Sequence, residues 1–221
     1  MVFVEIEDER WNHKTAENQS DMMKTKQDEY MMGRDTDLCG DPKTWFPMRV
    51  TYQREKKVKA ELDRLGVESF VPMKYRIAES QNDGESDVRR ELVPAINNLI
   101  FVRSSQARMS ELKMTNEVLE PLRYVMDRTA SREHAIMTVG DREMENFMRV
   151  ASVTDDSVMF LDESTIVGME GKRVVIMGGP FEGVTGVIRR VKRCKRVVVE
   201  LEGIASVAIA FVPVSLLKEI E

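Results

Sequence analysis

The densest group of chemically active side chains is a run of bases near the C-terminus. Six positive charges occur within eight residues there, at Arg189, Arg190, Lys192, Arg193, Lys195 and Arg196. Cations at this density can neutralise phosphates through counterion release without reading base sequence. The run predicts proximity to RNA or DNA. The alternative is a solvated loop that keeps its domain soluble, and no aromatic stacking platform accompanies the run.

A second basic segment lies between Arg54 and Arg64. Val58, Leu62 and Leu65 recur at helical spacing and Gly66 follows as a terminator, so the segment predicts an amphipathic helix with a basic exterior. Lys56 and Lys57 are its candidate nucleic-acid contacts. They could face DNA, or they could simply be the charged outer surface of a helix.

The remaining reactive residue types do not form a recognisable catalytic or metal-binding set. His13 and His134 stand in polar stretches without a nucleophile, phosphate-binding or zinc motif, and Cys39 and Cys194 have no second ligand at metal spacing. A catalytic histidine needs a positioned partner. The sequence therefore predicts no enzyme, no metal and no cofactor, with both cysteines as free thiols.

Charge and hydropathy limit where the protein acts. The net charge is −5, and residues 1–40 hold 10 acids and 5 bases, so any contact with nucleic acid must be local. The longest apolar run, Val207 to Val212, is far shorter than the ~20 residues of a membrane-spanning helix. We expect a cytoplasmic protein that makes no membrane contact and has a flexible N-terminal extension over residues 1–43.

Residues 44–151 alternate between strand and helix patterns. Strands are expected at 45–51, 67–77, 88–92, 99–102 and 122–126, with helices over 54–65, after an N-cap at Ser105, and along the apolar stripe that ends at Ala151. The turn-forming run SQNDGES joins the middle strands as a hairpin. Hairpins in place of repeated βαβ crossovers predict an α+β fold with a mostly antiparallel sheet.

A polar linker is expected over 152–166, followed by a small β-barrel over 167–221. Glycines punctuate its first hairpin, GKRVVIMGGPFEGVTGVIRRV, and short strands follow at 196–201, 206–211 and 214–217. Strands of these lengths are enough to close a five-stranded barrel. The residues expected to shape the hairpin are Gly171, Gly179, Pro180, Phe181, Gly183 and Gly186.

This glycine-punctuated hairpin resembles the KOW motif of SH3-like barrels in transcription elongation factors and some ribosomal proteins. Together with the WF strand, the helix opening YQREKKVKAEL, the strand ending FVP and the later strand VPAINNLIFV, the layout from residue 44 to the end resembles NusG. It looks most like the specialised UpxY-type paralogs. The resemblance implies an N-terminal NGN-like domain and a C-terminal KOW domain.

The resemblance also implies what the protein binds. NusG proteins grip the clamp helices of RNA polymerase through an apolar depression, and the matching positions here are Trp45, Phe46, Tyr52, Phe70, Pro94, Leu99 and Phe101. The alternative is that Trp45, Phe46 and Phe101 simply fill the domain core. The barrel would recruit a ribosomal protein or Rho.

The function implied is that of a non-catalytic elongation or antitermination factor. It would suppress pausing or termination by RNA polymerase, selectively at certain operons. The alternative is a KOW-containing RNA-binding module that acts on ribosomal RNA or the translation machinery. An extensive basic surface would favour that module, and the sequence pI of about 5.4 argues against it.

Overall fold

The computed structural model describes residues 36, 41–82, 85–127, 135–161, 166–167 and 171–220, without the side chains of 78–88 and 166–167. Thr44–Glu221 forms one compact unit, apart from Met1–Lys43. Every helix and strand below lies in that unit. His13, Cys39, His134 and almost all of the predicted extension fall outside the described residues.

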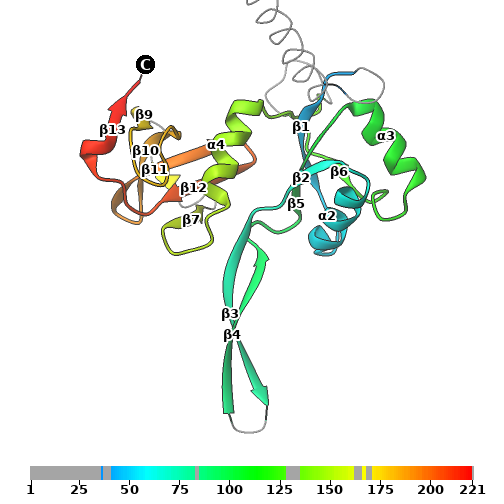
Figure 1. The fold of residues 1–221 in the computed structure, drawn as a ribbon, viewed down its shortest axis with the longest axis horizontal. Coiled ribbons are helices and arrows are strands. Elements are labelled where there is room, and N and C mark those ends of the chain that lie inside the picture. The colour runs from blue at the N-terminus through cyan, green and yellow to red at the C-terminus, as the bar shows by residue number, and fades with distance from the viewer. Residues whose placement is uncertain are drawn as a thin grey trace, which may run out of the picture. The chain divides into compact units, whose positions relative to one another are not determined.

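A four-stranded antiparallel sheet forms the centre of the N-terminal part (Figure 1). Its strands, in the order β2-β5-β1-β6, are β2 (Glu68–Phe70), β5 (Leu99–Ser104), β1 (Thr44–Arg49) and β6 (Arg123–Tyr124). The register of β1 with β5 runs from Thr44 opposite Ser104 to Arg49 opposite Leu99. Both central strands are buried almost throughout because apolar side chains are covered on both faces. The predicted α+β class with a mostly antiparallel sheet is confirmed.

Three helices belong to this part: α2 (Glu55–Arg64), α3 (Gln106–Thr115) and α4 (Asp141–Ala151). Helix α2 ends as its sequence predicts. Gly66 adopts a left-handed φ of 67°, its N–H donates to the Asp63 carbonyl, and the Val67 N–H donates to that of Leu62. This is a Schellman ending, which favours glycine at the left-handed position. The predicted N-cap is also confirmed, since Ser105 Oγ accepts from the Arg108 N–H.

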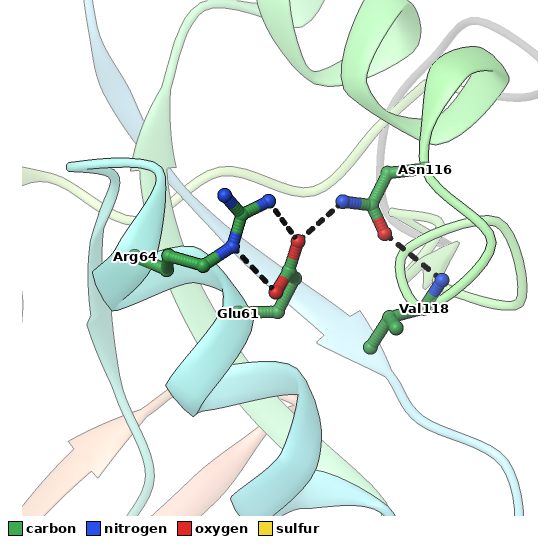
Figure 2. A network of polar contacts seen from close by, with 4 residues as sticks. All are labelled: Glu61, Arg64, Asn116 and Val118. Carbon is green, nitrogen blue, oxygen red and sulfur yellow. Dashed lines mark hydrogen bonds and ion pairs between the residues drawn. The ribbon is translucent and has the colours of Figure 1, made fainter.

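A polar network ties α2 to the turn after α3 (Figure 2). Glu61 accepts hydrogen bonds from Arg64 at 2.7 Å and from the Asn116 side chain at 2.6 Å, and Asn116 Oδ1 accepts from the Val118 N–H. The bonds from Arg64 and Asn116 lower the pKa of Glu61 to about 2. The carboxylate is therefore ionised at neutral pH and holds two helical segments together.

A separate two-stranded ribbon projects from this sheet, as Figure 1 shows. It consists of β3 (Met73–Asn82) and β4 (Glu85–Pro94). The strands are longer than expected, because the ladder continues through most of the predicted turn SQNDGES until Asn82 faces Glu85. Polar residues can extend a ladder as long as opposing backbones pair. The single strand expected over 67–77 is two strands, β2 and β3.

The C-terminal part is a second antiparallel sheet, in the order β13-β9-β10-β11-β12-β7, with β8 paired to β10. Its strands are β7 (Val158–Leu161), β8 (Ile166–Val167), β9 (Arg173–Ile176), β10 (Thr185–Val191), β11 (Cys194–Leu201), β12 (Ala205–Ile209) and β13 (Leu217–Glu219). This sheet is consistent with the small β-domain predicted from the sequence.

Three details of this sheet differ from the expectation. Strand β7 falls inside the predicted linker, because this apolar segment pairs with β12 as an additional strand of the sheet. The strand expected over 214–217 is a single 3-10 turn, η2 (Val214–Leu216), which follows Pro213 and leads into β13. Among the described strands, β13 and β7 form the two edges of the sheet and do not pair with each other, so no closed ring of hydrogen bonds forms.

Buried apolar side chains form two main clusters. The α2–α3 cluster includes Phe46, Met48, Leu62, Ile100 and Met109. The α4 cluster joins Trp45, Leu99 and Phe101 of the first sheet through α4 to the inner side chains of the second sheet, such as Val197, Val199 and Ile209. The N-terminal and C-terminal parts therefore share one apolar core, with α4 in the middle.

Gly186 marks a close backbone approach between β10 and β11 and gives a test of this sheet. A Cβ at this position would lie 2.7 Å from the Val198 carbonyl oxygen and 2.8 Å from a Val197 methyl. We expect Gly186→Ala to lower the free energy of unfolding by about 1–3 kcal/mol, the usual cost of overpacking. Urea unfolding of the full chain measures this change.

The matched control is Gly178→Ala, because a Cβ there meets only Leu216 at an ordinary 3.5 Å. That variant should stay within about 0.5 kcal/mol of the wild type. Equal stabilities of the two variants would contradict the packing of β10 against β11.

Candidate functional site

Strand alternation divides the predicted docking residues between the two faces of the first sheet. Trp45 lies in the α4 cluster, whereas Phe46 lies in the α2–α3 cluster and packs edge-on against Tyr124, with ring centroids 5.3 Å apart. Neighbouring residues of a strand point to opposite faces. Trp45 and Phe46 therefore point to opposite faces of the sheet, and the role of each in binding RNA polymerase stays a prediction.

Helix α4 covers the face of the sheet that holds Trp45, Leu99 and Phe101 of the predicted set. Leu99 and Phe101 are fully buried, and the Phe101 ring lies 5.7 Å from the Phe147 ring of α4. Phe70 is only half-buried and meets the same Phe147 ring at 6.5 Å. In this structure Trp45, Leu99 and Phe101 form the floor beneath α4, and Phe70 lies at its edge.

Two polar contacts fix α4 to the second sheet. The Asn146 side chain donates to Thr185 Oγ1 at 2.8 Å, and the Arg149 guanidinium donates to the Glu182 carbonyl at 2.8 Å. Thr185 is the first residue of β10, and Glu182 lies in the connection between β9 and β10. The apolar and polar contacts together place the C-terminal sheet against the helix that covers the predicted depression.

Tyr52 is the one member of the predicted set that is fully exposed, at 84% of its surface. It stands in a strained loop, because Tyr52 and Gln53 have φ of 58° and 53°. Bulky residues rarely adopt this left-handed conformation. The Arg54 guanidinium lies 5.6 Å from the Tyr52 ring centroid, so the loop presents an aromatic ring paired with a cation.

A buried carboxylate holds this loop in place. Glu55 is 1% exposed and accepts a hydrogen bond from the Asn98 N–H, while the Asn98 side-chain oxygen accepts from the Gln53 N–H. Asn98 also has a left-handed φ, of 59°. The Tyr52 loop is therefore braced by Asn98, which is 45 positions after Gln53 in the sequence and is itself held by Glu55.

The segment 94–98 connects the Tyr52 loop to Phe70 and Pro94. Ala95 donates its N–H to the Pro72 carbonyl, just after the strand of Phe70, and Asn98 bonds to the Tyr52 loop. Pro94 and Ile96 are half-buried along this segment. Phe70 and Ile96 pack against the α4 cluster, and the Tyr52 loop is bonded to the end of this segment at Asn98. We call Tyr52, Phe70, Pro94 and Ile96 the 94–98 rim.

The two candidate bases of α2 have different surroundings. Lys56 donates to the Leu92 carbonyl at 2.6 Å and so braces the ribbon against the helix. Lys57 is exposed and makes no hydrogen bond or ion pair with the described residues. A nucleic-acid role for either residue stays a prediction.

The basic run is part of a regular hairpin and not a loose loop. The β10–β11 ladder continues to Val191 opposite Cys194 and leaves only Lys192 and Arg193 in the turn. Arg189 pairs with Glu200 at 2.7 Å, and Arg196 donates to the Ala210 carbonyl. The run therefore divides into two bases held on the sheet and four exposed bases at the tip, namely Arg190, Lys192, Arg193 and Lys195.

The residues expected to shape the glycine-rich hairpin lie in its strands, before them, or in the connection between them. Gly171 precedes β9, Gly186 lies in β10, and Gly179, Pro180, Phe181 and Gly183 form the connection between the two strands. Phe181 is buried and adds its ring to the α4 cluster. The assignment of this segment as a KOW motif stays a prediction.

Within the described residues, no group of His, Cys, Asp and Glu side chains is arranged to hold a metal ion. None of the described helices has the length and apolar character that crossing a membrane requires.

The chain folds as an α+β part followed by a sheet that is consistent with a small β-domain. Residues 43–148 match the family model described as NusG, transcription termination factor nusG, so this segment is a NusG family domain. Such a domain supports a role in transcription elongation and antitermination. Among curated proteins, no sequence gives a significant match.

One solved structure that resembles the chain is described as domain interaction in Thermotoga maritima NusG. It is 20% identical in sequence, with a TM-score of 0.39, and the match covers 81% of this chain and 98% of that one.

Sequence reasoning missed two features of the site. The sequence predicts an apolar stripe on α4, which contains Phe147, but it does not predict that this stripe covers the first sheet. The apolar stripe of α4 is wider than one neighbouring element can cover. It consists of buried Met144, Phe147, Val150 and Ala151 and half-buried Met148. The width of this stripe is the sequence signal that could have indicated a second packing partner. The Glu55–Asn98 contact left no local signal, because it joins distant segments.

Proposed function

We propose that the protein is a transcription elongation and antitermination factor that binds RNA polymerase through its N-terminal part. It acts in the cytoplasm, suppresses pausing or termination, and does so at selected operons. The observation that carries this proposal is the NusG family domain over residues 43–148, folded as an antiparallel sheet with packed helices. The resemblance of the sequence to UpxY-type paralogs supports the operon-selective role.

The 94–98 rim is the surface we propose for the clamp helices of the polymerase. An aromatic ring beside a cation, next to half-buried apolar side chains, is the composition expected at the centre of an interface. Tyr52 supplies the ring, while Phe70 and Pro94 supply apolar surface. Trp45, Leu99 and Phe101 support the rim from below and would reach a partner only if α4 moved away.

A second partner, a ribosomal protein or Rho, is proposed for the C-terminal part. Among the described residues of this part, three large apolar side chains are exposed: Met177, Phe211 and Val214. The Met177 N–H donates to the carbonyl of Leu216, which lies in the same 3-10 turn as Val214, and Phe211 precedes that turn by three residues. Exposed apolar side chains gathered in this way are typical of a protein interface.

Transcription in vitro through a terminator, with and without the full chain, tests the proposal. We expect more read-through transcript when the protein is present, and RNA polymerase should be retained on the immobilised protein. An unchanged transcript ratio together with no retained polymerase would refute the proposed function. Recovery of ribosomal RNA without polymerase would favour the alternative, a module of the translation machinery.

A further inference from the structure

The tip of the β10–β11 hairpin concentrates positive charge where the fold disfavours it. Arg190 and Lys195 are directly opposite each other in the ladder, and like charges at opposed positions destabilise a sheet. Lys192 and Arg193 have φ of 48° and 70°. A two-residue turn with two positive φ values is normally occupied by Asn-Gly. Local stability alone therefore does not explain why these four positions of the hairpin carry basic residues.

No negative charge in the neighbouring sequence compensates the tip. There is no Asp or Glu between Glu182 and Glu200, and Glu200 pairs with Arg189. None of the four exposed bases makes an ion pair with the residues that the structure describes. Because the chain as a whole has a net charge of −5, the hairpin tip is a local positive surface on an acidic protein.

We propose that this tip binds the phosphodiester backbone of a nucleic acid. Its four cations occupy positions from 190 to 195 at the end of the hairpin, where β8 also pairs with β10. Several exposed cations along one stretch of backbone suit a polyanion better than a single small ion. Cys194 is the only uncharged exposed residue from 190 to 195, so the tip offers no aromatic ring for base stacking. Binding is therefore independent of base sequence.

The identity of the polyanion rests on the proposed function, since an elongation factor works beside both transcript and template. Single-stranded RNA and duplex DNA share the backbone chemistry that the tip recognises. They differ in charge spacing, so the salt dependence of binding separates them. Four contacts predict a slope of log K against log salt of about −2.8 on single strands and about −3.6 on duplex DNA.

The test measures fluorescence anisotropy of the full chain with a short mixed-sequence single-stranded RNA and, separately, a DNA duplex, between about 50 and about 200 mM salt. The decisive variant replaces the turn by its preferred residues, Lys192→Asn with Arg193→Gly. It removes two charges while improving the turn, so it should melt no lower than the wild type. For this variant, the slope of log K against log salt should become shallower, at about −1.4 on RNA or about −1.8 on the duplex.

The matched control removes the same charge elsewhere, through Arg142→Gln with Lys218→Gln, two exposed residues on α4 and β13. Its slope should equal that of the wild type. The proposal is overturned if the wild type binds neither nucleic acid, if the turn variant keeps the wild-type slope, or if polyglutamate displaces RNA as well as unlabelled RNA does. The last outcome would assign the tip to an acidic protein.

Retention of RNA polymerase by the turn variant separates this site from the proposed function. We expect retention equal to that of the wild type. If the wild type does not retain polymerase but shows the expected salt slopes, the proposed function is refuted and the hairpin site stands. Normal polymerase binding with no slope difference would do the reverse.

Discussion

Phe147→Ala is expected to lower the free energy of unfolding of the full chain by about 3–5 kcal/mol, the usual cost of emptying a large buried aromatic site. The Phe147 side chain is fully buried and meets the rings of Phe70 and Phe101. The cavity would open inside the one apolar core that both sheets share. Urea unfolding followed by circular dichroism measures the loss.

Phe211→Ala is the matched control, because it removes the same atoms from a side chain that is 79% exposed. It should change the free energy of unfolding by less than about 0.5 kcal/mol. If Phe147→Ala were as mild as this control, α4 could not lie between the two sheets as described.

Tyr52→Ala is expected to weaken binding to RNA polymerase by about tenfold or more, which is the loss typical of an aromatic interface anchor. Within its loop, the Tyr52 ring packs only against the Arg54 guanidinium. Removal of the ring should therefore leave the melting temperature unchanged. Titration of immobilised polymerase with wild type and variant measures the change in affinity. A cooperative melt for the variant shows that the fold is intact.

Met114→Ala provides the comparison, since Met114 is a large apolar residue of α3 with 81% of its surface exposed. Its affinity for polymerase should equal that of the wild type. Wild-type affinity in Tyr52→Ala would exclude Tyr52 from the docking surface. Phe101→Ala cannot serve this purpose, because its buried ring supports the fold itself.

The parts of the fold that sequence predicted well depend on local patterns. The spacing of Val58 and Leu62 fixed the inner face of α2, Gly66 ended it, and Ser105 began α3. Each of these signals acts within one or two turns of helix. The order of strands and helices in the N-terminal part follows from the same kind of evidence, apart from the division of one predicted strand at Pro72.

The parts that sequence could not supply depend on distant contacts. The Tyr52 loop takes its shape from Glu55 and Asn98, and the breadth of the apolar stripe on α4 makes sense only once a second sheet is present. The separation of Trp45 from Phe46 follows from strand alternation alone, because neighbours in a strand face opposite ways. The division of the basic run required the pairing of Arg189 with Glu200 across the hairpin.

The position of α4 sets a practical rule for recombining this chain with its relatives. A chimaera joined just after Ala151 would keep α4 from one parent and take β9–β12 from the other. Met144, Phe147 and Val150 would then meet foreign side chains, and Asn146 and Arg149 would need a matching hydroxyl and carbonyl in the grafted half. Exchange of the C-terminal half should therefore carry α4 with it, or redesign both of its surfaces together.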